Sequence, residues 1–379
     1  MTFRWVDDDA DLAGLVEELS AEPRYAIDTE FHRERTYYPK LALVQLAWPG
    51  GIALVDPLAT DARLLGKLFQ SEALAVLHAA QQDLDVLSHA AGAVPRRIYD
   101  TQIAAGFVGY STPSLVALVQ GELQQLPAKG DRLTDWLQRP LTATQMDYAA
   151  ADVRYLLELH DVLDAKLAAL GRTAWAAEVC EELRNRPTGQ TPPEDAWTKL
   201  KDARSLRPRS RAVAQAVAAW REREAQQLDV PVRQVLPDLG ILGISQRQPT
   251  TPEELARCRG LDDRHRRGRI ARELLQVIDE ARHADPPRTG GGGDELERHL
   301  RPAITLVSAW LSQVAKDARI DTSMLATRAD LVALLRGDES ARLRHGWRAE
   351  LIGDGITRLV AGSAALTFDG EGGLRLIDV

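Results

Sequence analysis

Four carboxylates in three short segments of this chain have the types and order needed to hold hard metal ions. Asp28 and Glu30 end the apolar segment 25–30, which has the composition of a buried strand. Alternate residues of a strand point to the same face, so the two acids share a face, roughly 6.6 Å apart along the strand. The alternative is a strand end carrying two solvated acids.

The other two carboxylates lie in stretches that read as helices. Asp83 is near the start of a helix expected over residues 81–91, where a carboxylate also suits the helix dipole. Asp85 follows two residues later, and residues at i and i+2 face different sides of a helix, so only one of them can face the strand acids. Tyr148 and Asp152 are separated by three alanines, which would place them one above the other on a helix and permit a close approach to the sheet.

Oxygen ligands converging from a strand and two helices are what a pair of Mg²⁺ ions requires. Two such ions, about 3.5–4 Å apart, stabilise the attacking and leaving oxygens of an in-line phosphoryl displacement. Tyrosine with a pKa of about 10 is a poor base at neutral pH, so Tyr148 is expected to orient the attacking water. The alternative for this helix is a buried tyrosine beside a surface aspartate. The pattern predicts metal-dependent hydrolysis of a phosphodiester.

The first 170 residues mix strand-like and helical patterns, which predicts a mixed sheet flanked by helices. The expected strands cover residues 24–30, 41–48, 52–55 and 74–78. The expected helices cover residues 61–70, 81–91, 100–108 and 114–119, followed by one long helix from Thr142 to Leu170.

The rest of the chain reads as helical units separated by segments rich in proline and glycine. Residues 186–193 hold three prolines, and residues 285–293 hold two prolines and four consecutive glycines. We expect three domains, at residues 1–195, 205–285 and 294–379, of which the last two are all-helical.

Composition points to an ordinary folded protein. Of 379 residues, 45% are hydrophobic and 27% charged, and no apolar run approaches the length of a membrane span. The N-terminus has no apolar signal core, and the two cysteines cannot build a disulfide framework. These features predict a cytoplasmic protein without a membrane segment.

The net charge of −8 is unevenly spread. Residues 1–198 hold 17 Lys+Arg against 29 Asp+Glu, whereas residues 199–285 hold 18 against 13. Seven arginines, including Arg266 and Arg267, crowd residues 257–272 of this basic part. A solvated face is the alternative, but local fields decide phosphate binding, so this stretch is the best candidate for holding RNA.

Several motifs resemble the DEDD superfamily of 3′→5′ exonucleases, in its subclass with a tyrosine in the third motif. The sequence around these motifs is similar to that of the ribonuclease D family. The motifs that carry the resemblance are Ile27-Asp28-Thr29-Glu30-Phe31, Arg35-Thr36-Tyr37-Tyr38-Pro39, Leu43-Val44-Gln45-Leu46, Leu77-His78-Ala79-Ala80-Gln81-Gln82-Asp83-Leu84, Thr134-Asp135-Trp136-Leu137 and Tyr148 with Asp152.

A second resemblance covers residues 207–284, which are similar to the HRDC domain. It is carried by Ala218, Trp220-Arg221-Glu222, Asp229-Val230-Pro231 and Val235-Leu236-Pro237-Asp238. Residues 294–379 echo it weakly, which suggests a diverged second copy.

The resemblance implies a ribonuclease H-like exonuclease domain followed by two all-helical HRDC-like domains. It favours Asp83 over Asp85 as the ligand from its helix, and it implies that Glu30 touches one ion and Asp28 bridges both. It makes several side chains candidates for substrate contact: Phe31, Tyr37, Gln45 and His78 along the path of the terminal nucleotides, and Lys129 and Arg132 at phosphates. For Phe31 core packing is an equal alternative, and Leu133 departs from the family's pattern beside Arg132.

The expected activity is therefore a metal-dependent 3′→5′ exoribonuclease with two divalent ions, Mg²⁺ or Mn²⁺. The resemblance implies release of 5′-mononucleotides from single-stranded 3′ tails of tRNA precursors and other small structured RNAs, by a monomer. Three alternatives remain open on sequence alone. They are a DNA exonuclease of the same superfamily, a catalytically inactive RNA-binding adaptor, and a scaffold that docks proteins.

Overall fold

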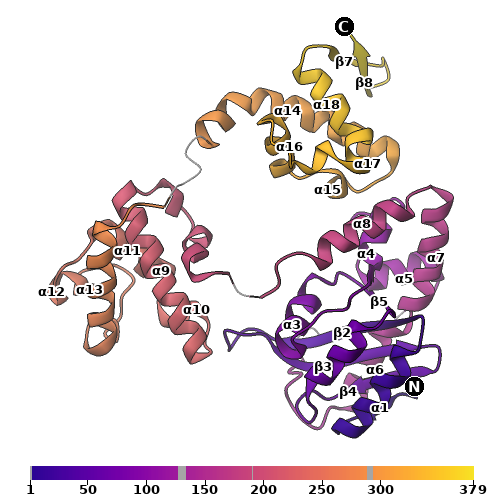
Figure 1. Ribbon diagram of the computed structural model, residues 1–379, viewed down its shortest axis with the longest axis horizontal. Coiled ribbons are helices and arrows are strands. Elements are labelled where there is room, and N and C mark those ends of the chain that lie inside the picture. Colours follow the sequence, from indigo (N-terminus) through magenta and orange to yellow (C-terminus); the bar gives the residue numbers. More distant parts are fainter. Residues whose placement is uncertain (1, 127–133, 190, 288–292) are drawn as a thin grey trace. The chain divides into compact units, whose positions relative to one another are not determined.

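The structure is a computed structural model that describes residues 2–126, 134–189, 191–287 and 293–379, with side chains for all of these except Arg204 and residues 293–298. The chain folds into two compact units (Figure 1). Unit 1 combines residues 1–30, 41–187 and 292–379, and unit 2 combines residues 31–40 and 188–291. No helix within the described ranges combines the length and apolar character needed to cross a bilayer.

A six-stranded mixed sheet forms the centre of the part of unit 1 that carries the predicted site. Its strands are β1 (Arg4–Val6), β2 (Arg24–His32), β3 (Lys40–Trp48), β4 (Gly51–Val55), β5 (Leu74–Leu77) and β6 (Ile98–Asp100), in the order β1-β4-β3-β2-β5-β6. β3 and β4 are antiparallel, whereas β1 with β4, β2 with β5 and β5 with β6 are parallel. The predicted mixed sheet is confirmed, and β2 occupies an interior position in it.

Helices cover this sheet and supply two of the three segments that carry the predicted site (Figure 1). They are α1 (Asp9–Ser20), α2 (Leu65–Gln70), α3 (Gln81–Ala91), α4 (Thr101–Gly106), α5 (Leu115–Leu123), α6 (Ala143–Arg154), α7 (Leu156–Ala169) and α8 (Thr173–Arg184). A 3-10 turn at Ala62–Leu64 precedes α2. α3 has the predicted bounds, and its end is set by Gly92 in the left-handed conformation (φ 69°).

The single long helix expected from Thr142 to Leu170 is wrong, because the chain forms α6 and α7 with a break at Tyr155. Ala149 and Ala150 of α6 pack with Trp136 and Leu54, whereas Val153 of α6 joins Leu156 and the later leucines of α7 in the larger core of unit 1. The sequence pattern is helical throughout this stretch and does not predict the break.

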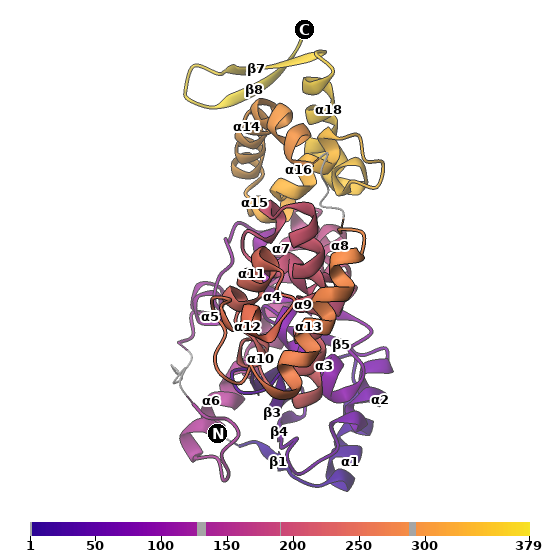
Figure 2. The ribbon, with the colours of Figure 1, turned by 90° about the vertical axis from the view of Figure 1, so that its left-hand side faces the viewer.

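The third sequence segment forms α14 (Gly293–Ala318), α15 (Thr322–Leu325), α16 (Arg328–Leu335), a 3-10 turn (Arg342–Arg344), α17 (Gly346–Arg348), a π-helical turn (Ala349–Gly353) and α18 (Asp354–Val360). It ends in an antiparallel hairpin of β7 (Ala364–Phe368) and β8 (Leu374–Asp378), which lies beside α14 and α18 (Figure 2). The expectation of an all-helical segment is wrong here. The hairpin alternates apolar and polar residues around a turn rich in glycine, as strands do.

This third segment shares a hydrophobic core with the catalytic part of unit 1. Trp347 stacks on Trp175 of α8 with ring centroids 5.0 Å apart and an interplanar angle of 14°. Arg348 is 1% exposed and donates to Glu178 (3.0 Å) and Glu182 (2.9 Å), which also lie on α8. The third segment is thus packed against α8 through aromatic stacking and a buried cation.

Unit 2 is helical apart from residues 31–40. Its elements are 3-10 turns at Pro193–Lys199 and Ala203–Ser205, and the helices α9 (Pro208–Leu228), α10 (Val232–Val235), α11 (Asp238–Arg247), α12 (Pro252–Ala256) and α13 (Gly268–His283). Apolar residues of these helices form one core, against which the ring of Tyr37 packs.

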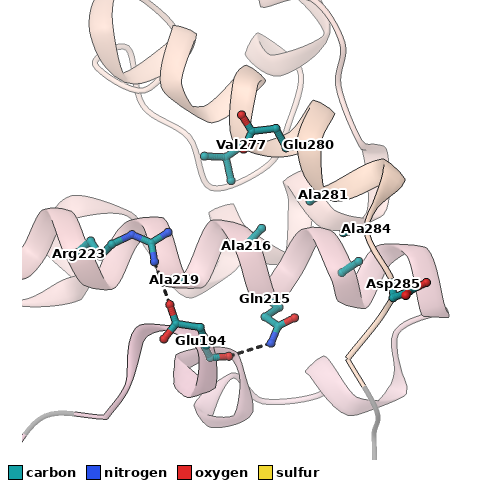
Figure 3. A pocket seen from close by; sticks show the side chains of 11 residues that line it. Glu194, Gln215, Ala216, Ala219, Arg223, Val277, Glu280, Ala281, Ala284 and Asp285 are labelled. Carbon is teal, nitrogen blue, oxygen red and sulfur yellow. Dashed lines mark hydrogen bonds and ion pairs between the residues drawn. The ribbon is translucent and has the colours of Figure 1, made fainter.

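An open groove of about 350 Å³ lies between α9 and α13 (Figure 3). Its floor is made of small apolar residues such as Ala212, Ala216 and Ala281. At its edge Glu194 pairs with Arg223 at 3.2 Å. The groove contains none of the acids of the predicted site.

Candidate active site

The first two acids lie on β2, inside the sheet. Tyr25, Ala26 and Ile27 are fully buried, so the strand is fixed by packing on both faces before the acids are reached. Asp28 and Glu30 are half-buried, as their position on one face of the strand requires. Thr29 between them is 5% exposed.

The third acid, Asp83, lies in the first turn of α3 and is 7% exposed. Its Oδ1 accepts a hydrogen bond of 2.5 Å from the hydroxyl of Thr29, which ties the helix to the catalytic strand. Asp28 interacts electrostatically with Asp83, so Asp83 faces the strand acids. Asp85, the alternative ligand, is less buried than Asp83 and lies two residues further along α3, on another side of the helix.

The start of α3 is held by a residue to which the sequence had given no role. The carboxylate of Asp100 accepts hydrogen bonds from the backbone N–H groups of Ala79 (3.1 Å) and Ala80 (2.8 Å), and also from Gln102 at the start of α4. Ala79 has a positive φ of 57°, a strained conformation that these bonds stabilise. Asp100 therefore fixes the turn that aims Asp83 at the strand.

The fourth acid lies with its tyrosine on α6. A capping box of Thr142 and Gln145 begins this helix, and the three alanines at 149–151 are buried against the sheet side. The hydroxyl of Tyr148 hydrogen-bonds the carboxylate of Asp152 one turn later. The ring of Tyr148 stacks on Trp136, with centroids 6.1 Å apart. Packing and hydrogen bonding together hold the Tyr148 hydroxyl at the acids.

The pKa values show that the four carboxylates form one electrostatic cluster. Burial, and then the charges of Asp83, Asp152 and Glu30, raise the pKa of Asp28 well above its ordinary value. Burial, and then the charges of Asp152 and Asp83, raise the pKa of Glu30 to about 8. Burial raises the pKa of Asp152 to about 7 and that of Asp83 to about 6, while hydroxyl groups act in the opposite direction on both.

This donor set fits a divalent cation chemically. It consists of hard oxygen ligands in a buried place, where each ionised carboxylate opposes the ionisation of its neighbours. A bound cation would allow all four to ionise. The side chains do not already close around one point, because no group of three or more His, Cys, Asp or Glu in the described ranges has metal-binding geometry. Asp83 and Asp152 are instead hydrogen-bonded to Thr29 and Tyr148.

His78 follows β5 and is half-buried, with both ring nitrogens near polar atoms. Nδ1 lies 2.9 Å from the Thr101 hydroxyl, and Nε2 lies 3.1 Å from the carbonyl oxygen of Pro113. Burial lowers its pKa. His78 thus has a structural role at this edge of the sheet, and its predicted contact with substrate stays a prediction.

The other predicted substrate residues are not all gathered at the acids. Phe31 directly follows Glu30 and lies under the guanidinium of Arg33, 5.0 Å from its ring centroid. Gln45 is fully buried in β3, and its amide has no hydrogen-bond partner among the described residues. Tyr37 is bonded to α9 of unit 2.

Four basic residues complete the predicted set. Arg266 pairs with Asp263 at 3.6 Å, and Arg267 is exposed at the residue preceding α13. Lys129 and Arg132 lie outside the described residues.

Comparisons with known proteins agree with this geometry. A family model described as "3'-5' exonuclease" matches residues 3–168, and one for the HRDC domain matches residues 210–278. Ribonuclease D of Acidiphilium cryptum is 36% identical over 376 residues, which cover 95% of this chain and 93% of the relative. Ribonuclease D of Nitrobacter hamburgensis is also 36% identical, over 95% of this chain and 96% of the relative. The chain belongs to the ribonuclease D family.

Solved structures extend this result to three dimensions. Escherichia coli RNase D superposes with a TM-score of 0.85 at 30% identity, over 96% of this chain and 99% of that chain. The catalytic core of RRP6 from Trypanosoma brucei gives a TM-score of 0.59 at 25% identity, over 74% of this chain. This member of the ribonuclease D family is a 3′→5′ exoribonuclease with an HRDC domain. One HRDC match was found, so the expected second copy is not supported.

Sequence reasoning missed Thr29 and Asp100 as positioning residues in this ribonuclease D family site. A signal existed for both. Thr29 is a polar residue between two acids in a buried strand. Asp100 is the first residue of an expected helix and in the structure immediately precedes α4, where aspartate caps the free N–H groups.

Proposed function

We propose that this exoribonuclease removes 5′-mononucleotides one at a time from single-stranded 3′ tails of tRNA precursors and other small structured RNAs. The observation that carries the proposal is the electrostatic cluster of Asp28, Glu30, Asp83 and Asp152 with Tyr148 bonded to one of its members. Such a cluster suits hydrolysis of a phosphodiester, whose transition state carries negative charge that must be neutralised.

Two divalent ions, Mg²⁺ or Mn²⁺, would be held by the carboxylates of Asp28, Glu30, Asp83 and Asp152. When bound, they would supply the lowered pKa of the attacking water and the stabilisation of the leaving oxygen. Their positive charge would also lower the pKa values that burial and mutual repulsion raise.

The protein's own groups orient the reaction. Burial, followed by the neighbouring acids, raises the pKa of the Tyr148 hydroxyl, so this group stays protonated at neutral pH. It therefore acts as a hydrogen-bond partner for the attacking water and not as a base. The stacked Trp136 restricts the ring to one plane, so the hydroxyl is already in place when the substrate binds.

Substrate contacts are assigned from chemistry. Phe31 offers an aromatic face next to Glu30, and His78 lies at the end of β5 beside α3. Arg267, together with Arg266, is suited to backbone phosphates. Lys129 and Arg132 keep this role as a proposal from sequence, and so does Gln45.

We further propose domain limits at 1–195, 205–285 and 294–379, with the last a diverged relative of the HRDC domain. The proposal also places the enzyme in the cytoplasm as a monomer. The two cysteines, far apart in the sequence, support a reducing compartment.

The test is product analysis on a 5′-labelled RNA hairpin with a single-stranded 3′ tail. We expect a ladder that shortens by single nucleotides, stops near the duplex, releases 5′-mononucleotides and ceases with chelator. A matched DNA hairpin should be degraded more slowly. Internal cleavage, activity unaffected by chelator, or a preference for DNA would contradict the proposal.

A further inference from the structure

Residues 31–40 comprise the last two residues of β2, the connection to β3 and the first residue of β3. This segment belongs to compact unit 2, although the rest of both strands belongs to unit 1. It begins directly after Glu30, one of the four acids. A segment held by the HRDC unit is therefore continuous with the catalytic strand.

Two residues of α9 and the residue that follows its last turn hold this connection. Asp229 caps the C-terminal end of α9 in the left-handed conformation (φ 48°), and its Oδ1 accepts hydrogen bonds from the backbone N–H groups of Tyr37 and Tyr38, each 3.1 Å. The Tyr37 hydroxyl donates to Glu222 (2.7 Å) and accepts from Gln226 (2.9 Å). Positions 222, 226 and 229 are spaced to face the same side of a helix.

Packing reinforces the hydrogen bonds. The Tyr37 ring packs against the hydrophobic core of unit 2 and meets Tyr38 edge to face, with centroids 4.9 Å apart. Burial, together with the bond to Glu222, raises the pKa of Tyr37, so its hydroxyl remains a donor. The connection is thus anchored at residues 37–38.

The residues nearer to Glu30 are exposed and charged, unlike the anchored residues 37 and 38. Arg33, Glu34 and Arg35 are exposed, and the Arg33 guanidinium lies over the ring of Phe31. Cations and an aromatic face that directly follow Glu30 in the sequence suit the phosphates and bases of a terminal nucleotide. The path of residues 31–35 depends on how residues 37 and 38 are anchored.

We propose that Tyr37 and Asp229 are positioning residues that hold residues 31–35 in one orientation for the 3′-terminal nucleotides. The inference rests on the proposed function, because it concerns the path of RNA to the four acids. It assigns the HRDC unit a role in the chemical step, exerted through the chain itself. A segment fixed before binding loses less freedom when substrate binds, and small misplacements of a positioning group reduce rates strongly. Tyr37 thereby acts as an anchor and not as a nucleotide contact.

Asp229 offers a matched pair of variants. Asp229→Gly keeps the positive φ without strain but removes the acceptor. Asp229→Asn keeps an acceptor oxygen and tolerates the left-handed conformation, so it should keep residues 37 and 38 attached to the end of α9. Tyr37→Phe keeps the ring and removes only the hydroxyl, so it tests the hydrogen bonds to Glu222 and Gln226.

The kinetic test compares kcat and KM on a trinucleotide and on a long-tailed RNA hairpin. We expect Asp229→Gly and Tyr37→Phe to lower kcat about tenfold on both substrates, and Asp229→Asn to stay near wild type. Wild-type kcat in the first two variants, or a loss seen only as a higher KM on the long RNA, would overturn the inference.

A second readout does not depend on activity. Hydrogen exchange at the backbone amides of Tyr37 and Tyr38 should be slow in the wild type and about tenfold faster in Asp229→Gly, while exchange inside α9 stays unchanged. Equal exchange in both proteins would show that Asp229 does not anchor residues 37 and 38, whether or not the enzyme hydrolyses RNA. A wild type that fails to hydrolyse RNA would instead overturn the proposed function, and the exchange result would still test the anchoring.

Discussion

The hydroxyl of Thr29 donates a 2.5 Å hydrogen bond to Oδ1 of Asp83, across 54 residues of sequence. Because Thr29 stands between Asp28 and Glu30, one strand supplies two acids and also the group that holds a third. Burial raises the pKa of Asp83 to about 6, and the Thr29 bond opposes this rise. The cluster of acids therefore depends on the Thr29 hydroxyl, which is not itself an acid.

Thr29→Val should therefore weaken the site without removing a carboxylate. The variant keeps the β-branched shape of the strand residue but leaves Asp83 without its donor, so the pKa of Asp83 should rise further. Loss of a hydrogen bond to a charged group costs about 1.5–3 kcal/mol, which corresponds to roughly a 10- to 100-fold higher Mg²⁺ requirement for hydrolysis. Rates measured over a Mg²⁺ titration check this. Thr29→Ser, which keeps the hydroxyl, is the control, and an unchanged Mg²⁺ requirement in the valine variant would refute the role.

Tyr148→Phe should lower kcat with little change in KM. The phenylalanine ring can still stack on Trp136, so the helix should pack as before, whereas the hydroxyl bonded to Asp152 is lost. Groups that act on the attacking nucleophile contribute about 10²- to 10⁴-fold, and a purely orienting group belongs at the lower end. Steady-state kinetics on a single-stranded RNA tail provide the measurement. A rise in KM alone would place Tyr148 in substrate binding instead.

The four acids and Tyr148 could be singled out because their types and spacing carry chemistry by themselves. The structure brings them into one electrostatic cluster, and their catalytic roles stay predictions. The strand that ends in Asp28 and Glu30 and the helix that begins before Asp83 were also readable from apolar pattern and capping. What the sequence could not show is where these elements meet. The bond from Thr29 to Asp83 joins residues far apart in the chain, and no local pattern encodes it.

Other differences have separate physical causes. β1 and β6 are three residues each, too short for a periodic signal, and they exist because β4 and β5 offer them parallel partners. The break at Tyr155 lies inside a continuous helical pattern that gives no signal for it. The hairpin at 364–378 has the alternation of apolar and polar residues that is typical of strands, which our sequence analysis missed. The anchoring of residues 31–40 by Asp229 depends on tertiary contact alone.

The stability of the metal-free protein should fall as pH rises. The pKa is raised to about 6 for Asp83, about 7 for Asp152 and about 8 for Glu30, whereas carboxyl groups of the unfolded chain titrate at about 4. The folded protein therefore binds more protons than the unfolded chain between about pH 4 and pH 8, so the free energy of unfolding decreases across this window.

Thermal unfolding in chelator at several pH values across this window measures the effect. We expect Tm to decline towards the upper end, and Mg²⁺ to raise Tm more there than at the acidic end. Asp28→Asn should flatten the decline, because one repelling charge is gone. A constant Tm in chelator would contradict the electrostatic cluster.

Arg348→Met should destabilise the packing of the third segment on α8. The substitution removes the buried cation that donates to Glu178 and Glu182, and losing hydrogen bonds between charged groups costs about 1.5–3 kcal/mol. Arg342→Met is the matched control. It removes a cation from the same Glu182, but Arg342 is 37% exposed, so the expected cost is at most about 1 kcal/mol.

Urea unfolding followed by tryptophan fluorescence reports this difference, because Trp347 and Trp175 stack at the same contact. Equal midpoints for the two variants would show that the buried position of Arg348 is without consequence.

The most direct test of the central claim compares Asp28→Asn with Asp85→Asn. Both replace an aspartate by a side chain of the same size, but only Asp28 belongs to the cluster with Glu30, Asp83 and Asp152. With Mg²⁺ and a single-stranded RNA tail, Asp28→Asn should lose at least about two to three orders of magnitude in kcat while still binding RNA, and Asp85→Asn should keep wild-type rates. Hydrolysis at the wild-type rate by Asp28→Asn would contradict the account.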